Sequence, residues 1–325
     1  MDIFNNRTIL ITGGTGSFGK RFTDILLKGH KPKKIIIYSR DEVKQHEMQQ
    51  QLKEHENLRF FIGDVRDKDR LLMAFHGVDF ILHAAALKQV PAMEYNPAEA
   101  VKTNTLGAIN IIDAAIERNV KKVIALSTDK ACNPINLYGA TKLCSDKLFI
   151  AGNSYAGKAD TRFSVVRYGN VVGSRGSVVP FFAERIREGI IPLTDRRMTR
   201  FFITLDQAVD FVMRCFVMMH GGELFVPKIP SVRIIDVAKT MAPHSRIKIV
   251  GIRPGEKLHE VMISEDDSRN AIEFKDYYIV KPSFPWWDDT VHYKGNGLPD
   301  GFKYASNTNK DWLEGARLKK ILGSA

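Results

Sequence analysis

The sequence of 325 residues lacks the features that mark membrane, secreted and metal-binding proteins. No apolar run approaches the roughly 18 residues that a membrane-spanning helix needs, and the first residues show no basic segment followed by an apolar one. Only three cysteines are present, Cys132, Cys144 and Cys215, and neither they nor the nine histidines have the spacing of a metal site. We therefore expect a cytoplasmic protein with free thiols, no membrane segment and no bound metal.

The chain is also short of acidic residues, so that its formal net charge is +11 and its pI is about 9.4. Such a balance raises the question of a nucleic-acid partner. The basic clusters are short, as in Lys31-Pro32-Lys33-Lys34, and aromatic residues are not interleaved with them. An anionic small-molecule substrate or a solvated basic face accounts for the charge as well, and we expect no nucleic-acid partner.

Short apolar runs alternate with helical patterns through the first half of the chain. Continuous apolar runs are typical of parallel strands that are covered on both faces. The predicted strands are residues 8–12, 34–38, 59–63, 80–83, 123–127, 163–167 and, later, 223–227. The helical patterns place on common faces Phe18, Phe22, Ile25 and Leu26, and then Val101, Ala108, Ile112 and Ala115. The alternation predicts an α/β fold, a Rossmann doubly wound parallel sheet with a smaller, interleaved C-terminal lobe.

A glycine-rich turn, residues 13–19, follows the first predicted strand and opens a helix. Glycines let the backbone turn tightly and approach a pyrophosphate, and the start of the helix offers free N–H groups. This context predicts a dinucleotide site. We expect residues 1–170 to form the dinucleotide-binding domain, which also receives about 200–230, and residues 171–325 to form mainly a substrate-binding lobe.

The end of the second predicted strand indicates which dinucleotide binds. An NAD site usually places an acidic residue there to hold the ribose hydroxyls. Here Ser39 and Arg40 come first, and an arginine matches a 2′-phosphate, so NADP is favoured. In the alternative, Arg40 caps a surface turn and Asp41 binds the ribose. The residues expected to hold the cofactor are Gly13, Thr15, Gly16, Ser17, Phe18, Gly19, Ser39, Arg40, Asp41, Glu42, Lys44, Asp64, Val65, Ala84, Ala85, Thr103, Tyr138, Lys142 and Val171.

Two pairs of residues around position 130 predict acid–base chemistry. Tyr138 and Lys142 are one helical turn apart, so an ammonium there would stabilise a phenolate and make the tyrosine a usable base. Asp129 and Lys130 follow a buried strand and suggest an acid and a base of different character. The alternative is a surface loop followed by a helix with an incidental tyrosine.

Together these motifs resemble the extended short-chain dehydrogenase/reductase superfamily, with Asn104 as a further match. Within it the chain is similar to the soluble, inverting UDP-N-acetylglucosamine 4,6-dehydratases, which begin pseudaminic acid biosynthesis. Retaining sugar dehydratases typically carry Thr-Asp-Glu where this chain has Thr128-Asp129-Lys130. The closer signatures are residues 38–42, 84–88, 126–130, 166–171 and 252–257. The resemblance covers about residues 5–265 well and the rest loosely.

The resemblance implies a three-step reaction. Tyr138 takes the proton of the sugar 4-hydroxyl while NADP takes a hydride, with Thr128 bonded to the same oxygen and the pKa of Tyr138 lowered by Lys142. Lys130 then removes the carbon 5 proton and Asp129 protonates the leaving 6-hydroxyl. This requires a depressed pKa for Lys130, from burial or a nearby cation, and a protonated Asp129. The hydride returns to carbon 6, and carbon 5 is reprotonated from the opposite face.

The expected substrate is UDP-N-acetylglucosamine. The resemblance implies that it is bound by Lys88, Thr128, Asp129, Asn170, Arg175, Val178, Thr194, Arg253 and Glu256. It also implies a homo-oligomer larger than a dimer, with a hexamer as one form. Three alternatives stay open at this point: a retaining UDP-sugar 4,6-dehydratase, a nucleotide-sugar 4-epimerase that needs only Tyr138 and Lys142, and a non-catalytic NADP-binding regulator.

Overall fold

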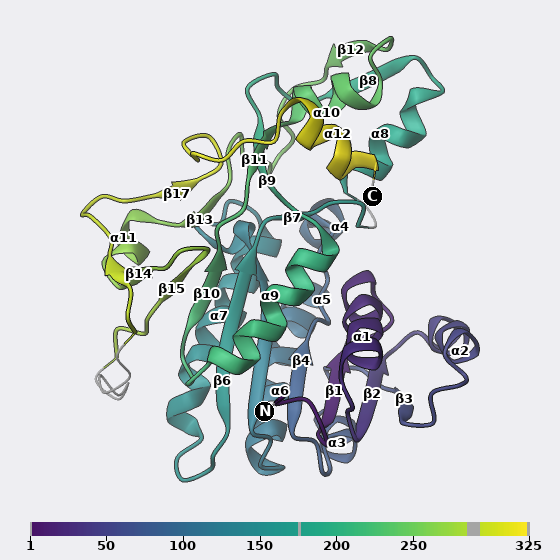
Figure 1. The fold of residues 1–325 in the computed structure, drawn as a ribbon, viewed down its shortest axis with the longest axis vertical. Helices are drawn as coiled ribbons and strands as arrows, with labels where there is room; N and C mark the ends of the chain where they lie inside the picture. Colours follow the sequence, from purple (N-terminus) through teal and green to yellow (C-terminus); the bar gives the residue numbers. More distant parts are fainter. Residues whose placement is uncertain (1, 175–176, 285–292, 324–325) are drawn as a thin grey trace.

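The computed structural model describes residues 2–174, 177–284 and 293–323, and its centre is one twisted ten-stranded sheet (Figure 1). The strand order is β16-β14-β15-β10-β6-β5-β4-β1-β2-β3, and the strands from β3 through β10 are parallel. The sheet consists of β1 (Thr8–Thr12), β2 (Lys34–Ser39), β3 (Leu58–Ile62), β4 (Phe80–His83), β5 (Lys122–Thr128), β6 (Arg162–Tyr168), β10 (Leu224–Pro227), β14 (Ala271–Glu273), β15 (Tyr277–Val280) and β16 (Asn296–Gly297). The predicted doubly wound parallel sheet is confirmed.

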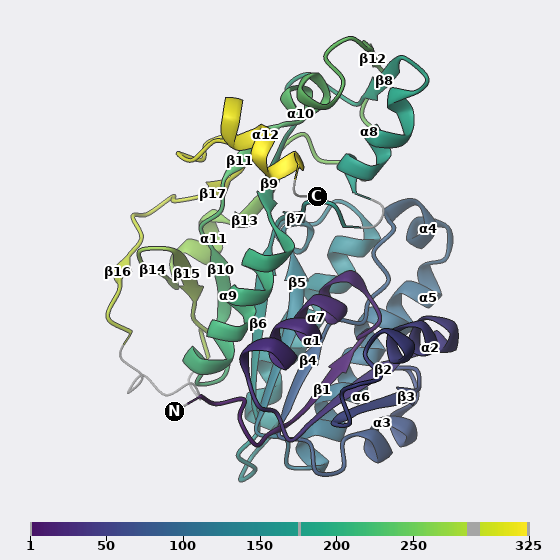
Figure 2. The ribbon, with the colours of Figure 1, turned by 45° about the vertical axis from the view of Figure 1, so that its right-hand side comes forward.

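Helices cover both faces of this sheet, which explains why its central parallel strands carry continuous apolar runs. In β1, Ile9 and Ile11 pack with Phe22 of α1, whereas Leu10 faces the opposite cluster with Ala108 of α6. One face carries α1 (Ser17–Gly29) and α9 (Leu205–Met218), and the other carries α3 (Lys68–Ala74), α6 (Gly107–Glu117) and α7 (Leu137–Tyr155) (Figure 2). Further helices of the first half are α2 (Glu42–Gln51), α4 (Val90–Tyr95) and α5 (Pro97–Val101).

A π-helical turn, η1 (Lys102–Leu106), separates α5 from α6. The predicted common face of this region is therefore wrong for Val101, which is 39% exposed, while Ala108, Ile112 and Ala115 are buried. A π turn inserts an extra residue into the helical repeat and so rotates the residues before it away from those after it.

The second lobe sits above the carboxyl ends of the parallel strands (Figure 1). It has its own apolar core, which includes Phe182, Ile191 and Val237. Its elements are β7 (Asn170–Val171), α8 (Val178–Ile186), β8 (Ile190–Leu193), β9 (Thr199–Ile203), β11 (Ser231–Arg233), α10 (Ile234–Met241), β12 (Arg246–Ile249) and α12 (Gly315–Gly323). Beside the main sheet lie α11 (Glu265–Ser268) and a separate two-stranded sheet of β13 (Val261–Ile263) and β17 (Tyr304–Ala305), whose side chains join the core of the main sheet.

The two lobes are interleaved along the chain. After β9 the chain returns to the main sheet through α9, whose N-terminus is held by a capping box between Thr204 and Gln207. The predicted strand at 223–227 is confirmed as β10, parallel to β6. Residues 271–297 also supply three antiparallel strands to the edge of the main sheet. None of the helices in the described part of the chain is both long and apolar enough to cross a membrane.

Candidate active site

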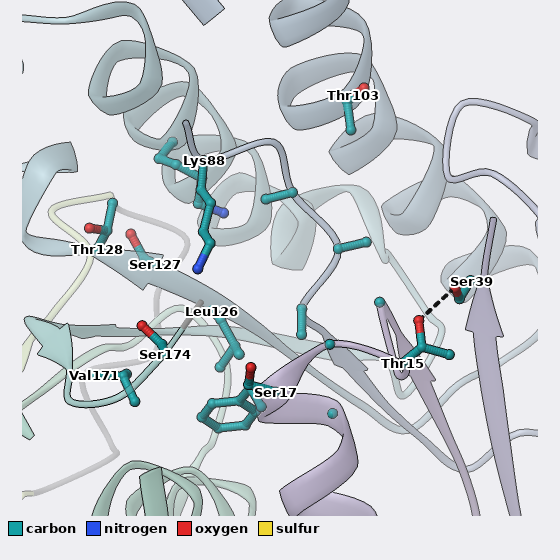
Figure 3. Close-up of a pocket in the computed structure, with 18 of the residues that line it drawn as sticks. Thr15, Ser17, Ser39, Lys88, Thr103, Leu126, Ser127, Thr128, Val171 and Ser174 are labelled. Carbon is teal, nitrogen blue, oxygen red and sulfur yellow. Dashed lines mark hydrogen bonds between the residues drawn. The ribbon is translucent and has the colours of Figure 1, made fainter. Parts of the chain in front are cut away.

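A cavity of about 600 Å³ opens along the carboxyl ends of the parallel strands. Ligands of doubly wound folds bind at this edge, because the loops there diverge around the switch point of the strand order. Its wall combines the glycine turn after β1, the ends of β2 to β6, and residues of α7 and β7. Figure 3 shows the side chain of Lys88 extending into this space from the loop after β4.

The glycine turn forms a cradle that side chains would fill. Gly13 has a φ of +65°, and a Cβ there would lie 2.9 Å from the Cα of Ala85. A Cβ on Gly19 would lie 2.5 Å from the Cα of Gly14, so glycine lets α1 approach the turn closely. No side chain caps the N-terminus of α1. The helix therefore presents N–H groups and the positive end of its dipole to the cavity. Both features favour the binding of an anion such as a pyrophosphate.

The adenosine end of the cavity is formed by the ends of β2 and β3. Ser39 and Thr15 share a hydrogen bond of 2.9 Å (Figure 3). The side chain of Arg40 is 52% exposed and lies 3.5 Å from a carboxylate oxygen of Asp64. Asp41 caps α2, because its carboxylate accepts from the backbone N–H of Lys44 and pairs with that lysine's ammonium.

Buried polar atoms on the wall have no partner among the described residues. They include Thr103 Oγ1, Asn170 Oδ1 and Asp129 Oδ2. A buried polar atom without a hydrogen bond costs free energy, so such atoms mark places where a ligand completes the bonding. Together with the glycine cradle and the uncapped helix, they fit a dinucleotide and a polar substrate.

The residues around position 130 meet at one end of the cavity. Asp129 and Lys130 begin a short 3-10 turn, η2 (Asp129–Ala131), directly after β5. Lys130 Nζ lies 3.0 Å from Asp129 Oδ1, and the Thr128 hydroxyl donates to the same oxygen at 3.0 Å. Tyr138 and Lys142 line the same wall from α7.

Helix α7 is fixed by polar bonds to two neighbouring segments. The side chain of Asn136 accepts from the N–H of Gly139 at 2.7 Å and donates to the carbonyl of Gly255. Asn104, in the π turn, bonds both backbone groups of Leu87 and donates to Thr141 at 3.1 Å. The π turn thereby ties α7 to the loop that carries Lys88.

Two expectations about acid–base strength are wrong: that the pKa of Lys130 is depressed, and that Lys142 lowers the pKa of Tyr138. Burial alone would lower the pKa of Lys130, but the carboxylates of Asp129 and Glu260 outweigh it and raise that pKa. Burial raises the pKa of Tyr138 to about 12, although Lys130 and a hydrogen bond with Thr128 act against this. Burial lowers the pKa of Lys142, with Asp146 opposing the shift.

Most of the predicted site residues lie on the wall of the cavity. All the predicted cofactor-binding residues line it except Glu42, and four of the predicted substrate-binding residues do, Lys88, Thr128, Asp129 and Asn170. Arg175 lies outside the described residues. Val178, Thr194, Arg253 and Glu256 are not on the wall; the last three form a separate cluster in which Arg253, 67% exposed, pairs with Glu256 at 3.1 Å.

Sequence reasoning missed a buried charged layer behind the site. Glu260 lies 3.4 Å from Lys130 Nζ, and Arg200 and Lys257 lie close to Glu260. A second group joins Asp146 to Ser127 at 2.7 Å and to Arg167 at 3.2 Å. In the sequence, the only hint of this layer is that Glu260 directly precedes the apolar strand β13, which suggests that the glutamate is buried. No group of residues able to hold a metal occurs in the part of the chain that the structure describes.

Comparisons with known proteins show which family the chain is similar to. The model of the polysaccharide biosynthesis protein family matches residues 9–282. The chain is 57% identical to the UDP-N-acetylglucosamine 4,6-dehydratase (inverting) of Campylobacter jejuni, over 98% of each protein. It is 44% identical to the UDP-glucose 4-epimerase of Rickettsia conorii, over 86% of this chain and 84% of that one.

A solved structure shares the whole fold. The X-ray structure of Pen from Bacillus thuringiensis superimposes with a TM-score of 0.91 at 36% identity, covering 99% of this chain and 98% of that one. The chain therefore belongs to the polysaccharide biosynthesis protein family of extended short-chain dehydrogenase/reductases, the family that includes the inverting UDP-N-acetylglucosamine 4,6-dehydratase of Campylobacter jejuni.

Proposed function

We propose that the protein catalyses the NADP-dependent 4,6-dehydration of UDP-N-acetylglucosamine with inversion at carbon 5. This hydro-lyase reaction gives a UDP-2-acetamido-2,6-dideoxy-L-arabino-hexos-4-ulose, the first step of pseudaminic acid biosynthesis. The observation that carries the proposal is the amine and carboxylate of Lys130 and Asp129, 3.0 Å apart on the cavity wall that also holds Tyr138. A 4-epimerase has no use for this pair. The printed name of the 57% identical relative supports the same reaction.

The glycine cradle and the N-terminus of α1 would hold the pyrophosphate of the cofactor, and Thr103 and Lys142 would contact its nicotinamide half. When bound, the dinucleotide accepts a hydride from sugar carbon 4 and returns it to carbon 6. In this proposal residues 1–170, with about 200–230, bind the cofactor, and the remaining part of 171–325 binds mainly the substrate.

Tyr138 takes the proton of the sugar 4-hydroxyl. Its high pKa makes the phenolate a strong base, and the nearby charge of Lys130 favours the ionised form. Oxidation at carbon 4 serves the next step, because a 4-ketone acidifies the proton on carbon 5. The chain therefore needs a second base that is separate from Tyr138.

Lys130 and Asp129 provide that base together with an acid. Transfer of one proton from Lys130 Nζ to Asp129 Oδ1, along their hydrogen bond, yields a neutral amine and a carboxylic acid at once. The amine takes the carbon 5 proton, the freed electron pair forms the carbon 5–carbon 6 double bond, and the 6-hydroxyl leaves as water with the proton of Asp129. The pair is then an ammonium and a carboxylate again, as it began. After the hydride has returned to carbon 6, carbon 5 takes a proton of solvent origin from the opposite face, and Tyr138 releases the 4-hydroxyl proton to solvent, so that the whole reaction removes one water.

The choice of NADP rests on Arg40. Asp41 is engaged as the cap of α2, which leaves the half-exposed Arg40 as the group suited to a 2′-phosphate. We expect Arg40→Ala to weaken NADP binding about 10- to 100-fold, since a hydrogen bond to a charged group contributes about 1.5–3 kcal/mol. Binding of NAD should change little. Titration calorimetry with both dinucleotides measures this, with the exposed Arg269→Ala as control. Equal weakening of both would show that Arg40 does not select NADP.

The reaction itself is tested by incubating the protein with UDP-N-acetylglucosamine and following the sugar by NMR. We expect the signals of the 6-hydroxymethyl group to be replaced by a methyl group, together with a 4-keto sugar. A 4-epimer that keeps its 6-hydroxyl would contradict the proposal and favour an epimerase, as in the Rickettsia relative's name. The absence of turnover would favour a regulator. Self-association stays a prediction, which sedimentation velocity measures.

A further inference from the structure

A buried glutamate, Glu260, lies directly behind Lys130. Its Oε1 is 3.4 Å from Lys130 Nζ, which also contacts Asp129 Oδ1 at 3.0 Å, and its side chain is 2% exposed. Lys130 lines the cavity, whereas Glu260 does not. A substrate in the cavity would therefore touch Lys130 but not Glu260.

The main chain of Glu260 is clamped by the C-terminal segment. Its N–H donates to the hydroxyl of Ser306 at 2.9 Å, and the N–H of Ser306 donates to its carbonyl at 2.8 Å. The Ser306 hydroxyl also bonds that of Thr199 in β9 at 2.7 Å. These bonds fix the main chain of Glu260 between β9 and the segment after β17.

Two further cations lie beside the carboxylate of Glu260, in addition to Lys130. Arg200 Nε lies 3.7 Å from Glu260 Oε1, and Lys257 Nζ lies 3.8 Å from Glu260 Oε2. The Arg200 guanidinium also donates to three backbone carbonyls, and the Lys257 ammonium donates to the carbonyl of Cys132. Both cations are therefore anchored elsewhere while they lie beside this buried carboxylate.

We propose that Glu260 is a positioning residue for the dehydration: it holds the side chain of Lys130 toward the cavity and stabilises the positive charge that forms on Nζ when Lys130 takes the carbon 5 proton. The inference rests on the proposed function. Asp129 loses its negative charge when it holds the proton for the 6-hydroxyl, so it stops balancing Lys130 when the amine is needed. Glu260 takes no part in these proton transfers, and its carboxylate, 3.4 Å from Lys130 Nζ, makes the amine a stronger base.

The groups that face Lys130 define what a substitution changes. They are Asp129 from its own turn, Tyr138 from α7, Arg200 from β9, and Lys257 and Glu260 from the segment before β13. Of the two carboxylates, only Glu260 lies outside the reacting groups. Removing its charge destabilises the ammonium, so Lys130 becomes a weaker base that loses its proton at lower pH.

The test compares the pH dependence of dehydration in the full-length protein and in Glu260→Gln, with exposed Glu265→Gln as the matched control. We expect about a 100-fold lower rate in Glu260→Gln. The falling limb, at which the Lys130–Asp129 pair loses its shared proton to solvent, should move about 1–3 units to lower pH. Glu265→Gln should match the unaltered protein. Glu260→Asp keeps the charge but withdraws it by one methylene, and should show a smaller loss and a smaller movement of the limb.

A purely structural glutamate would give a different result. Glu260→Gln would then lose the same factor at every pH with its limb unmoved, and that outcome overturns the proposal. If Glu260→Gln does not fold, Glu260→Asp decides: a limb at lower pH supports the proposal, and an unmoved limb overturns it. Failure of the proposed function looks different again, because the unaltered protein would then release no water from the sugar.

Discussion

Replacing Lys130 by methionine should stop dehydration while leaving the cofactor bound. Methionine keeps the length of the side chain but has no amine, so nothing else at this position can take the carbon 5 proton. Loss of a general base costs about 10²–10⁴ in rate, and we expect the larger end because the 6-hydroxyl cannot leave before that proton does. In oxidation at carbon 4 the proton goes to Tyr138 and not to Lys130, so the absorbance of reduced nicotinamide should still rise after mixing with substrate and persist. The rise should be slower than in the unaltered protein, because the charge of Lys130 favours the ionised form of Tyr138.

The measurement combines steady-state turnover, a single-turnover absorbance trace and the cofactor content of the purified variant. Lys147 lies exposed on α7, and Lys147→Met is the control for loss of one positive charge. Normal turnover of Lys130→Met would show that another group is the base. Loss of the cofactor as well as of activity would mean that the substitution had damaged the site as a whole.

A single methyl group at Gly139 should have an effect of comparable size. A Cβ there would lie 2.1 Å from the carbonyl oxygen of Lys130 and 3.0 Å from Pro134 Cβ. Because both the turn that carries Lys130 and the helix that carries Tyr138 meet at this point, one of them must move. Displacement of a catalytic group by about 1 Å costs about 100-fold in rate, and overpacking costs about 1–3 kcal/mol of stability.

We therefore expect Gly139→Ala to lose at least about 100-fold in kcat/KM and to have a lower Tm. Gly29, at the end of α1, is the matched control, because nothing lies within 4 Å of a Cβ built on it. Gly29→Ala should keep full activity and an unchanged or higher Tm, since alanine favours a helix over glycine. An active Gly139→Ala would show that the close contact between η2 and α7 does not set the geometry of the site.

The sequence predicts the main sheet well because its strands carry a strong local signal. β1 and β4 are continuous apolar runs that end in turn residues, and their observed bounds coincide with the predicted ones. The glycine turn is equally local, since its function depends on one strand and one helix that adjoin it. The four-residue spacing of Tyr138 and Lys142 places both on the cavity wall for the same reason.

Features that depend on contacts between distant parts of the chain could not be predicted from local sequence patterns. The short strands β14, β15 and β16 join the edge of the main sheet through antiparallel pairing, which no local pattern in residues 271–297 specifies. The π turn at Lys102–Leu106 breaks the helical repeat without a proline or glycine inside it, so Val101 was assigned to the wrong face.

The electrostatics of the site depend on the same long-range contacts. From sequence, Lys130 has one carboxylate neighbour, and burial is expected to lower its pKa. The fold brings Glu260 against it from 130 residues further along the chain, and the direction of the shift reverses. The proposed reaction does not need a low pKa for Lys130, because in it Asp129 accepts the proton that Lys130 loses.

The most direct test of inverting dehydration is to run the reaction in heavy water and determine the configuration and isotope at carbon 5 by NMR. We predict one deuterium at carbon 5, in the L-arabino configuration, next to a methyl group that carries the hydride transferred from carbon 4. A product that keeps the original configuration at carbon 5 would contradict the assignment of Lys130 and favour a retaining dehydratase. A 6-deoxy product with hydrogen still at carbon 5 would show that the proton removed there does not exchange with solvent, contrary to reprotonation from the opposite face.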